Sequence, residues 1–233
     1  MQHTTNTKTA PVQFAVFDIE EVELGLRLGS GGFSDVYEVK SFRQVNTRNQ
    51  RRKHLHRGVR DTLTRLAPDG HYAIKFLKQE LVEDPEGFDA AARDLQLEAD
   101  ILSRLDHENI LKIRGWASAG LEAYSEMDRH DAYFLILDRL QKTLAQRIDE
   151  WYCWTSGADS ATKDMKTRNK LLLEQLELAL DIATGLEYLH EEGYIYRDLK
   201  PDNIGLDSRS RGKLFDFGLA RKLPEGNTDD RFE

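Results

Sequence analysis

Hydrophobic and polar residues alternate along the first patterned part of the chain. Over residues 22–28 the apolar side chains fall on every second position, which predicts a half-buried strand. A glycine cluster at residues 29–32 and a second short strand over residues 36–39 follow, so we expect a hairpin here. The apolar run YAIKFL, residues 72–77, predicts a further strand.

The later part of the chain changes mostly to helical periodicity. Residues 86–105, 143–152 and 170–191 predict helices, and short apolar runs at 110–113 and 133–137 predict strands. The longest helix is apolar on more than one face, which predicts that other elements cover most of its surface. Strands with one helix therefore precede a mostly helical part, and this segregation predicts an α+β fold with two lobes.

Three segments interrupt these patterns. The polar N-terminal tail, residues 1–21, is expected to be disordered. Residues 41–70 form an insert between the second and third predicted strands, and residues 40–65 contain nine lysines and arginines but one acidic residue, Asp61. This basic insert is a candidate docking site for an acidic partner, and the alternative is a solvated, disordered loop. A polar insert at residues 155–169 is likewise expected to be a loop.

The composition, with 39% hydrophobic and 32% charged residues, is that of an ordinary globular protein. The formal net charge of −8 argues against bulk binding to nucleic acid or to an anionic membrane. No apolar run approaches the roughly 20 residues that span a bilayer, and the N-terminus lacks the apolar core of a signal peptide. Together with the single cysteine, Cys153, these features predict a cytoplasmic protein, with a nuclear one as the alternative.

Two glycines, a lysine and a glutamate carry candidate chemistry in the first half of the chain. Gly29 and Gly31 lie at the tip of the predicted hairpin, where a backbone without side chains can approach a polyphosphate closely. The alternative there is a flexible turn. Lys75 lies inside an apolar strand, and Glu98 lies close to the apolar face of the following helix. A pair between them would hold the ammonium group against phosphate oxygens, whereas each residue alone also fits a solvated surface position.

The densest group of polar residues lies near the end of the chain. Asp198 and Asn203 are in one loop after the long helix, and Asp216 follows a short apolar strand, GKLF. Two carboxylates and an amide supply the hard oxygen ligands that suit Mg²⁺. One carboxylate must remain to accept a proton from an attacking hydroxyl. Lys200 could neutralise charge on a transferred phosphoryl group.

In this order, these residues resemble the signature of the eukaryotic protein kinases. The matching stretches are the glycine-rich loop at 29–36, YAIK with Lys75, Glu98, YRDLKPDN at 196–203 and DFG at 216–218. The resemblance covers about residues 22–222 and implies transfer of the γ-phosphoryl group of ATP to a protein substrate. It assigns the acceptance of the hydroxyl proton to Asp198, and Mg²⁺ binding to Asn203 and Asp216.

The resemblance also implies a set of nucleotide-binding residues. Lys75 would hold the α- and β-phosphates and pair with Glu98. Leu137 would flank the back of the adenine pocket, and residues 138–140 would form the hinge. The full set is Leu28, Gly29, Gly31, Val36, Ala73, Lys75, Glu98, Leu137, Asp138 and Leu140.

Single residues refine this comparison. Lys200, which joins Asp198 as a catalytic residue, resembles the serine/threonine branch of the family. Arg197 implies a kinase that is switched by phosphorylation of its activation loop, because a cation there can pair with a phosphate. Tyr196 replaces the usual histidine, and an aromatic ring can fill the same packing position. Gly205 replaces an apolar side chain under the adenine, a loss worth roughly 1–2 kcal/mol of nucleotide binding if nothing else fills the gap.

Two further departures bear on activity. Ser34 replaces the third glycine of the loop, which is a mild change. The family continues past DFG through an Ala-Pro-Glu motif and several helices, whereas this chain has residues 219–233 there. We therefore expect a kinase domain over residues 22–233, with an N-terminal lobe over 22–138 and an incomplete, poorly active C-terminal lobe over 139–233. The main alternative is a pseudokinase or scaffold-type binding module. A small-molecule kinase of related fold fits less well.

Overall fold

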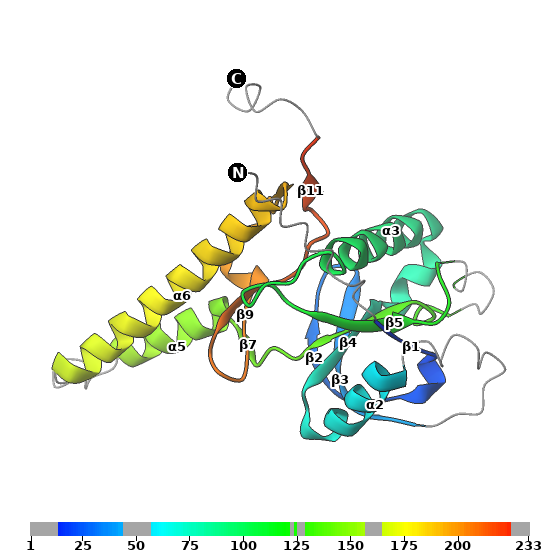
Figure 1. Ribbon diagram of the computed structural model, residues 1–233, viewed down its shortest axis with the longest axis horizontal. Coiled ribbons are helices and arrows are strands. Elements are labelled where there is room, and N and C mark those ends of the chain that lie inside the picture. Colours follow the sequence, from blue (N-terminus) through cyan, green and yellow to red (C-terminus); the bar gives the residue numbers. More distant parts are fainter. Residues whose placement is uncertain (1–13, 44–56, 122–123, 125–128, 157–164, 225–233) are drawn as a thin grey trace, which may run out of the picture. The chain divides into compact units, whose positions relative to one another are not determined.

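The structure, a computed structural model, describes the following residues: 14–43, 57–121, 124, 129–156 and 165–224. The chain divides into two compact units. The first unit comprises residues 1–92 and 113–138, and the second comprises residues 93–112 and 139–233. The largest sheet belongs to the first unit and the longest helix to the second (Figure 1). This division confirms the predicted α+β fold with two lobes.

Among the described residues, the first unit contains a six-stranded sheet in the order β1-β5-β6-β4-β3-β2. Its strands are β1 (Ala15–Phe17), β2 (Val22–Ser30), β3 (Ser34–Phe42), β4 (Tyr72–Leu77), β5 (Ile113–Ala117) and β6 (Phe134–Asp138). β1 runs parallel to β5, and the other neighbouring strands pair antiparallel. The hairpin and strands β4 and β6 lie where the sequence pattern predicts them, whereas β5 begins at Ile113 instead of Ile110.

The centre of this sheet forms the core of the first unit. β4 and β6 are apolar at consecutive positions rather than at alternate ones, which is typical of strands buried on both faces. Their fully buried residues are Ile74, Leu77, Phe134, Leu135 and Ile136. Burial of each such side chain contributes roughly 1.5–3 kcal/mol. Within β4, Lys75 alone is half-buried, so the polar residue that the sequence singles out lies in a strand otherwise closed to water.

The segment before β2 is folded, although the sequence predicts a disordered tail over residues 1–21. β1 and the 3-10 helix η1 (Ile19–Glu21) pack at the edge of the sheet, and Phe17 is fully buried. The ring of Phe17 stacks on that of Phe42, with centroids 4.2 Å apart. Three residues suffice for this edge strand because the backbone of β5 pairs with them. Residues 1–13 lie outside the described residues, and their disorder stays a prediction.

The basic insert is also folded in part, which corrects the expectation of a disordered loop over residues 41–70. It contains helix α2 (Arg57–Leu66). The apolar residues of α2 fall on one face, and Leu63 on that face is 2% exposed. Residues 44–56 lie outside the described residues, so the docking of an acidic partner stays a prediction.

Three further helical elements follow α2. They are η2 (Ala67–Asp69), η3 (Gln79–Glu83) and α3 (Pro85–Leu102). Gly70 ends η2 with a φ of 71°, a left-handed conformation that glycine adopts at little cost. α3 begins at a proline, which suits the first helical position. It lies close to residues 86–105, where the periodicity predicts a helix.

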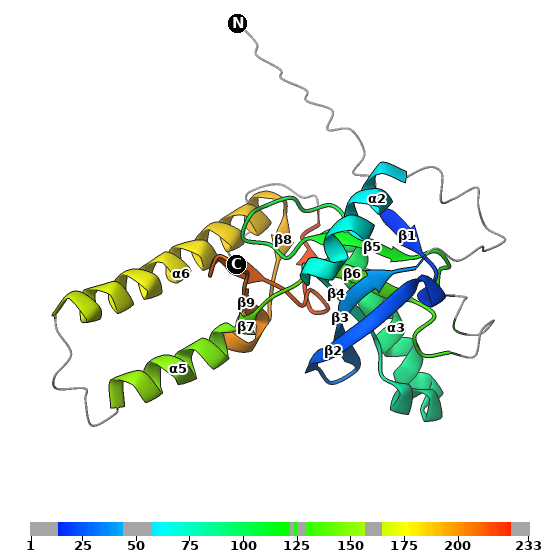
Figure 2. The same ribbon diagram turned by 90° about the horizontal axis from the view of Figure 1, so that it is seen from below.

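The second unit is built on two helices that lie side by side (Figures 1 and 2). They are α5 (Leu144–Ser156) and α6 (Met165–Glu191). Arg147 of α5 donates two hydrogen bonds of 2.8 Å to the carboxylate of Glu174 in α6. Two small sheets in the described part of this unit have the orders β10-β9-β7 and β11-β8. Their elements, with one 3-10 helix, are β7 (Lys142–Thr143), β8 (Tyr194–Ile195), η5 (Pro201–Asn203), β9 (Ile204–Leu206), β10 (Gly212–Leu214) and β11 (Arg221–Lys222).

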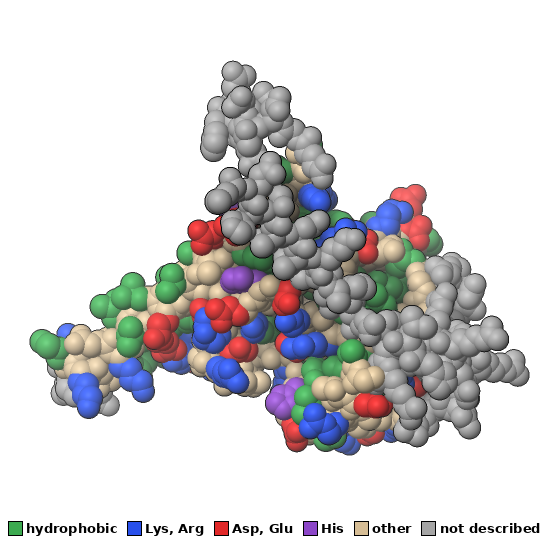
Figure 3. Space-filling model, in the orientation of Figure 1, with side chains coloured by type: hydrophobic (Ala, Val, Ile, Leu, Met, Phe, Trp, Pro, Cys, Tyr) green, Lys and Arg blue, Asp and Glu red, His purple; other side chains and the backbone are tan. Residues whose placement is uncertain are grey.

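Helix α6 has a buried face and an exposed apolar face. The buried residues recur every three or four positions: Leu178, Asp181, Gly185 and Leu189. The exposed leucines, each more than half accessible to solvent, are Leu172, Leu173, Leu176 and Leu180. Figure 3 shows hydrophobic side chains, in green, on the surface of this helix. Among the described residues, nothing supplies the cover that the sequence predicts for this second face. No helix in this part of the chain has both the length and the apolar character needed to cross a membrane.

Candidate active site

The YRDLKPDN loop, residues 196–203, brings three of the predicted site residues together. The Nζ atom of Lys200 donates to Oδ2 of Asp198 at 2.8 Å, and Nδ2 of Asn203 donates to the same oxygen at 2.7 Å. Nδ2 of Asn203 also donates to the backbone carbonyl of Asp198 at 3.1 Å. The loop thereby fixes the carboxylate of Asp198 from two sides.

These contacts also set the charge of the loop. The hydrogen bond from Lys200, with a smaller contribution from Asn203, lowers the pKa of Asp198 and outweighs the opposing effect of burial. The same hydrogen bond raises the pKa of Lys200. Both groups therefore remain ionised at neutral pH. An ionised carboxylate is the form that can accept a proton from a substrate hydroxyl.

Tyr196 anchors the start of the loop in the core of the second unit. Its side chain is 2% exposed, and its ring packs edge-on against Phe217 with centroids 5.2 Å apart. The hydroxyl lies within hydrogen-bond distance of the backbone carbonyls of Phe215 and Asn203, which share its single proton. Burial, together with nearby carboxylates, raises the pKa of Tyr196, so the phenol remains a neutral donor. The tyrosine therefore fills the packing position and also ties the loop to the DFG segment.

The carboxylates that surround Tyr196 are those that the sequence selects. In order of their effect on its pKa, after burial, they are Asp216, Asp198 and Glu98, and all three belong to the second unit. Glu98 is 2% exposed in α3, which does not fit the alternative of a solvated surface residue. The structure therefore gathers the predicted proton acceptor, one predicted metal ligand and the predicted lysine partner around one buried ring.

Two residues of this region hold unusual backbone conformations. Arg197 has a φ of 66° and Asp216 has a φ of 63°, in the left-handed region that costs a non-glycine residue free energy. A hydrogen bond is made by the first residue and by the neighbour of the second. Nε of Arg197 donates to the carbonyl of Leu219 at 2.8 Å, and the N–H of Phe215 donates to the carbonyl of Asn203 at 3.1 Å. Strain held in this way is concentrated at functional sites.

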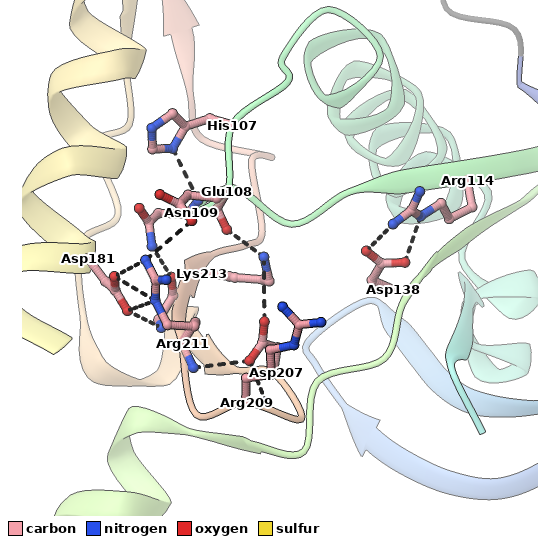
Figure 4. A network of polar contacts seen from close by, with 11 residues as sticks. His107, Glu108, Asn109, Arg114, Asp138, Asp181, Asp207, Arg209, Arg211 and Lys213 are labelled. Carbon is pink, nitrogen blue, oxygen red and sulfur yellow. Dashed lines mark hydrogen bonds and ion pairs between the residues drawn. The ribbon is translucent and has the colours of Figure 1, made fainter. Parts of the chain in front are cut away.

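Behind the loop lies a polar network that the sequence analysis did not identify (Figure 4). Asp181 of α6 accepts hydrogen bonds from Nε and Nη2 of Arg211 at 3.1 and 2.8 Å, and from the N–H of Gly212 at 2.7 Å. Nδ2 of Asn109 donates to the carbonyl of Gly212 at 2.9 Å. Burial disfavours the charged form of Asp181, but Arg211 and Gly212 outweigh it and lower the pKa. One feature of the sequence could have indicated this role: Asp181 comes three positions after Leu178 and therefore lies on the same face of the helix.

The same network fixes the position of the DFG segment within the second unit. The backbone of Leu214 donates to the carbonyl of Asn109 at 2.8 Å and accepts from Leu111 at 2.9 Å. Lys213 donates to the carbonyl of Glu108 (Figure 4). These contacts attach β10 on both sides, and Asp216 follows two residues after β10 ends. The predicted metal ligand therefore follows closely after a strand that hydrogen bonds hold on both sides.

Gly205 does not leave the gap that the sequence analysis considers. A Cβ atom built on Gly205 would lie 2.9 Å from Cγ and 3.1 Å from Cδ2 of Leu140. The side chain of Leu140 therefore already occupies the space that a side chain at position 205 would fill. β7 and β9 bring the two residues together, since Thr143 pairs with Gly205. Glycine is needed here because of this close approach.

In the first unit, the glycine-rich turn connects β2 to β3. Cβ atoms built on Gly29 and Gly32 meet no atom within 4 Å, and one built on Gly31 makes only ordinary contacts. None of the three has a positive φ. Neither backbone conformation nor packing among the described residues therefore requires glycine at these positions. Close approach of a ligand to this backbone is a remaining physical reason.

The other predicted nucleotide-binding residues of the first unit lie on neighbouring strands. Lys75 pairs in register with Val36 of β3 and with Leu135 of β6. Ala73 pairs with Leu137 in the same way, and Leu28 is 36% exposed in β2. Lys75 and Glu98 belong to different units, so their pairing stays a prediction.

The donor set of the second unit suits Mg²⁺. In the described part of the chain, no cluster of three or more His, Cys, Asp and Glu side chains could hold a metal ion. Mg²⁺ does not need one, because it commonly takes one or two protein oxygens together with waters and phosphate oxygens. Asp216 offers a carboxylate, and Asn203 offers an amide oxygen whose nitrogen already binds Asp198. These two residues fit the group.

Comparison with known proteins agrees with this geometry. Residues 58–232 match the family described as the protein kinase domain. A probable serine/threonine-protein kinase of Arabidopsis thaliana, PBL17, is 30% identical over 222 residues, which covers 91% of this chain and 39% of that protein. Calmodulin-binding receptor-like cytoplasmic kinase 2 of the same plant is 28% identical over 203 residues, with coverages of 85% and 37%. The chain thus spans well under half the length of these relatives.

Fold and site together define a two-unit α+β protein of the kinase class. More particularly, this chain belongs to the protein kinase family, because the family match covers most of its length. The predicted resemblance is therefore confirmed. The similar plant proteins are described as serine/threonine and receptor-like kinases.

Proposed function

We propose that the protein is a serine/threonine protein kinase that transfers the γ-phosphoryl group of ATP to a hydroxyl group of a protein substrate. One observation carries this proposal: the side chains of Lys200 and Asn203 both donate hydrogen bonds to the same carboxylate oxygen of Asp198. This arrangement leaves the other oxygen to orient the substrate hydroxyl and to accept its proton. Because the reaction consumes ATP, we propose a cytoplasmic site of action, with a nuclear one as the alternative.

The remaining residues would bind Mg²⁺ and the nucleotide phosphates and would neutralise the negative charge of the phosphates. Asn203 and Asp216 would hold Mg²⁺, which when bound neutralises charge on the phosphate oxygens. Lys200 would offset charge on the transferred group. In the first unit, the glycine-rich turn would present backbone N–H groups to the phosphates, and Lys75 would hold the α- and β-phosphates. Catalysis would rest on positioning and charge stabilisation rather than on covalent chemistry.

Phosphorylation of a generic basic protein with labelled ATP tests the proposal. Asp198→Asn removes the proton acceptor and should lower the rate by about 10²–10⁴-fold. Asp202→Asn removes the same charge from an exposed position of the same loop and serves as the matched control, with a rate close to that of the unchanged protein. Equal rates for Asp198→Asn and Asp202→Asn would refute the assignment. Lys75→Met should abolish transfer while the fold persists.

The exposed face of α6 favours a second candidate function. Four leucines of this helix face solvent, a pattern that fits a binding surface. In this alternative, residues 1–233 act as a scaffold-type module with weak or no transfer of phosphate. MgATP binding with unmeasurable phosphorylation would favour this alternative. Turnover that is lost in Asp198→Asn would favour the kinase.

A further inference from the structure

A β-bulge in β5 directs an arginine toward the end of β6. Ile113 pairs with Leu137, and Gly115 pairs with Ile136, so Arg114 is the extra residue of the bulge. Bulges bend a strand, re-aim a side chain and are over-represented beside functional sites. Here the bulge lies next to the last residues of β6, which the kinase resemblance assigns to the nucleotide.

The re-aimed side chain binds Asp138, the last residue of β6. Nε of Arg114 donates to Oδ1 at 2.6 Å, and Nη2 donates to Oδ2 at 2.7 Å (Figure 4). Two parallel bonds of this kind fix the relative orientation of both groups. The side chains are 39% and 25% exposed, so solvent screens the charges and the pair contributes little to stability. What the pair does supply is a fixed direction for the chain at Asp138.

The bulge is in turn fitted to the N-terminal strand. Gly115 pairs with Ala15 of β1, and a Cβ on Gly115 would lie 2.5 Å from the carbonyl oxygen of Ala15. β1 is held by Arg60 of α2, which donates to the carbonyl of Val16 and lies 4.2 Å above the ring of Phe17. A continuous set of contacts within the first unit therefore leads from α2 through β1 and the bulge to the end of β6.

We propose that Arg114 is a positioning residue for the nucleotide base, acting through Asp138. The inference rests on the proposed function, because it requires the backbone at the end of β6 to receive the base. By fixing the Asp138 side chain, the arginine fixes the peptide groups on either side. Arg114 does not touch the phosphates in this scheme, so the base and phosphate contributions to binding should separate.

The experiment measures binding of MgATP, adenosine and inorganic tripolyphosphate to Arg114→Gln and Asp138→Asn. Each substitution should weaken MgATP and adenosine by roughly tenfold and leave tripolyphosphate unchanged. The double variant should be no weaker than either single one, because both remove the same interaction. Arg114→Lys keeps the charge but not the two-point geometry, and it should recover part of the affinity.

Arg129→Gln is the matched control. Arg129 makes the same kind of two-point contact with Asp131 at 2.8 Å, in the same unit and with similar exposure. This pair lies before the start of β6, at the opposite end of that strand from Asp138. Arg129→Gln should bind all three ligands like the unchanged protein. The inference is overturned if Arg114→Gln binds adenosine normally, if it loses tripolyphosphate equally, or if Arg129→Gln behaves the same way. Absence of MgATP binding in the unchanged protein would instead overturn the proposed function and, with it, this inference.

Discussion

Each unit of the molecule contains a buried carboxylate held by an arginine from a distant part of the sequence. In the first unit, Glu21 is 1% exposed and accepts a 2.9 Å hydrogen bond from Arg60. In the second, Asp181 is 6% exposed and accepts several hydrogen bonds from Arg211, with one more from Gly212. The two carboxylate–arginine pairs stabilise different parts of the molecule. One holds an accessory helix against β1, and the other holds the strand that leads to DFG.

The difference lies in how many other contacts depend on each pair. Asp181 binds both a side chain and the backbone of β10, and the neighbouring Asn109 binds the same strand. Glu21 binds Arg60 and the N–H of Asp18, at the edge of the sheet. Loss of the first pair should therefore spread to the active site. Loss of the second should stay within the N-terminal region.

The largest expected effect is that of Arg211→Met. It removes the cation from a buried carboxylate, a change that costs about 3–5 kcal/mol when one partner of a buried pair is lost. The arginine is 46% exposed, so the lower end of that range applies. Urea unfolding monitored in the second unit measures the loss, and phosphorylation should fall with it. Arg209→Met, in the exposed turn beside it, is the control; an equal loss there would refute the special role of the pair.

Arg60→Met should cost less, about 1–3 kcal/mol, because Glu21 loses one of its hydrogen-bond donors while buried. Hydrogen exchange should rise in α2 and β1 and stay unchanged in the second unit. Arg65→Met, in the same helix and exposed, should leave exchange as it is. Faster exchange around β10 in Arg60→Met would break the contrast between the two regions.

Deletion of residues 43–68 would be harmless if the insert were a loop. Because the insert contains α2, the deletion should instead destabilise the first unit.

Gly205→Ala tests the close approach inside the second unit. The added methyl group meets Leu140, and overpacking of this kind costs about 1–3 kcal/mol. Melting temperature is the measurement. Leu140→Ala in the same chain should recover part of the loss, since it vacates the space. Two additive losses would show that the side chain of Leu140 does not occupy that position.

The smallest expected effect is a change in acid sensitivity. The pKa of Asp181 is lowered from its usual value of 3.8 in the folded protein. Its contribution to stability is therefore fully present above that value and is lost as the pH falls through the lower, folded pKa. Asp181→Asn should flatten the acid limb of the stability curve by up to about 1.4 kcal/mol per pH unit, the effect of one proton. An unchanged slope would contradict the lowered pKa.

These two regions also show what the sequence can and cannot predict. The YRDLKPDN loop was predictable because its contacts are local, with Lys200 and Asn203 within five residues of Asp198. Strand β4 was predictable from a continuous apolar run. The folding of β1 was not, since its short apolar run gains stability from residues far along the chain, in β5 and α2, and from Phe42. The packing of α2 was not predictable either, because Glu21, the partner of Arg60, lies 39 residues away. A stretch rich in basic residues also has the composition of a solvated loop.

The pairing of β1 with β5 has a consequence for the order of assembly during synthesis. Ala15 and Gly115 are neighbours in the sheet but 115 − 15 = 100 residues apart along the chain. At about 5–20 residues per second, the ribosome needs roughly 5–20 s to make the partner after β1 has been made. Until then, the elements already made that β1 contacts are β3, through the stacking of Phe42 on Phe17, and α2, through Arg60. β1 is thus made before β2–β6 but can pair within the sheet only after β5 has been made. A nascent chain stalled before β5 would lack the strand with which β1 pairs.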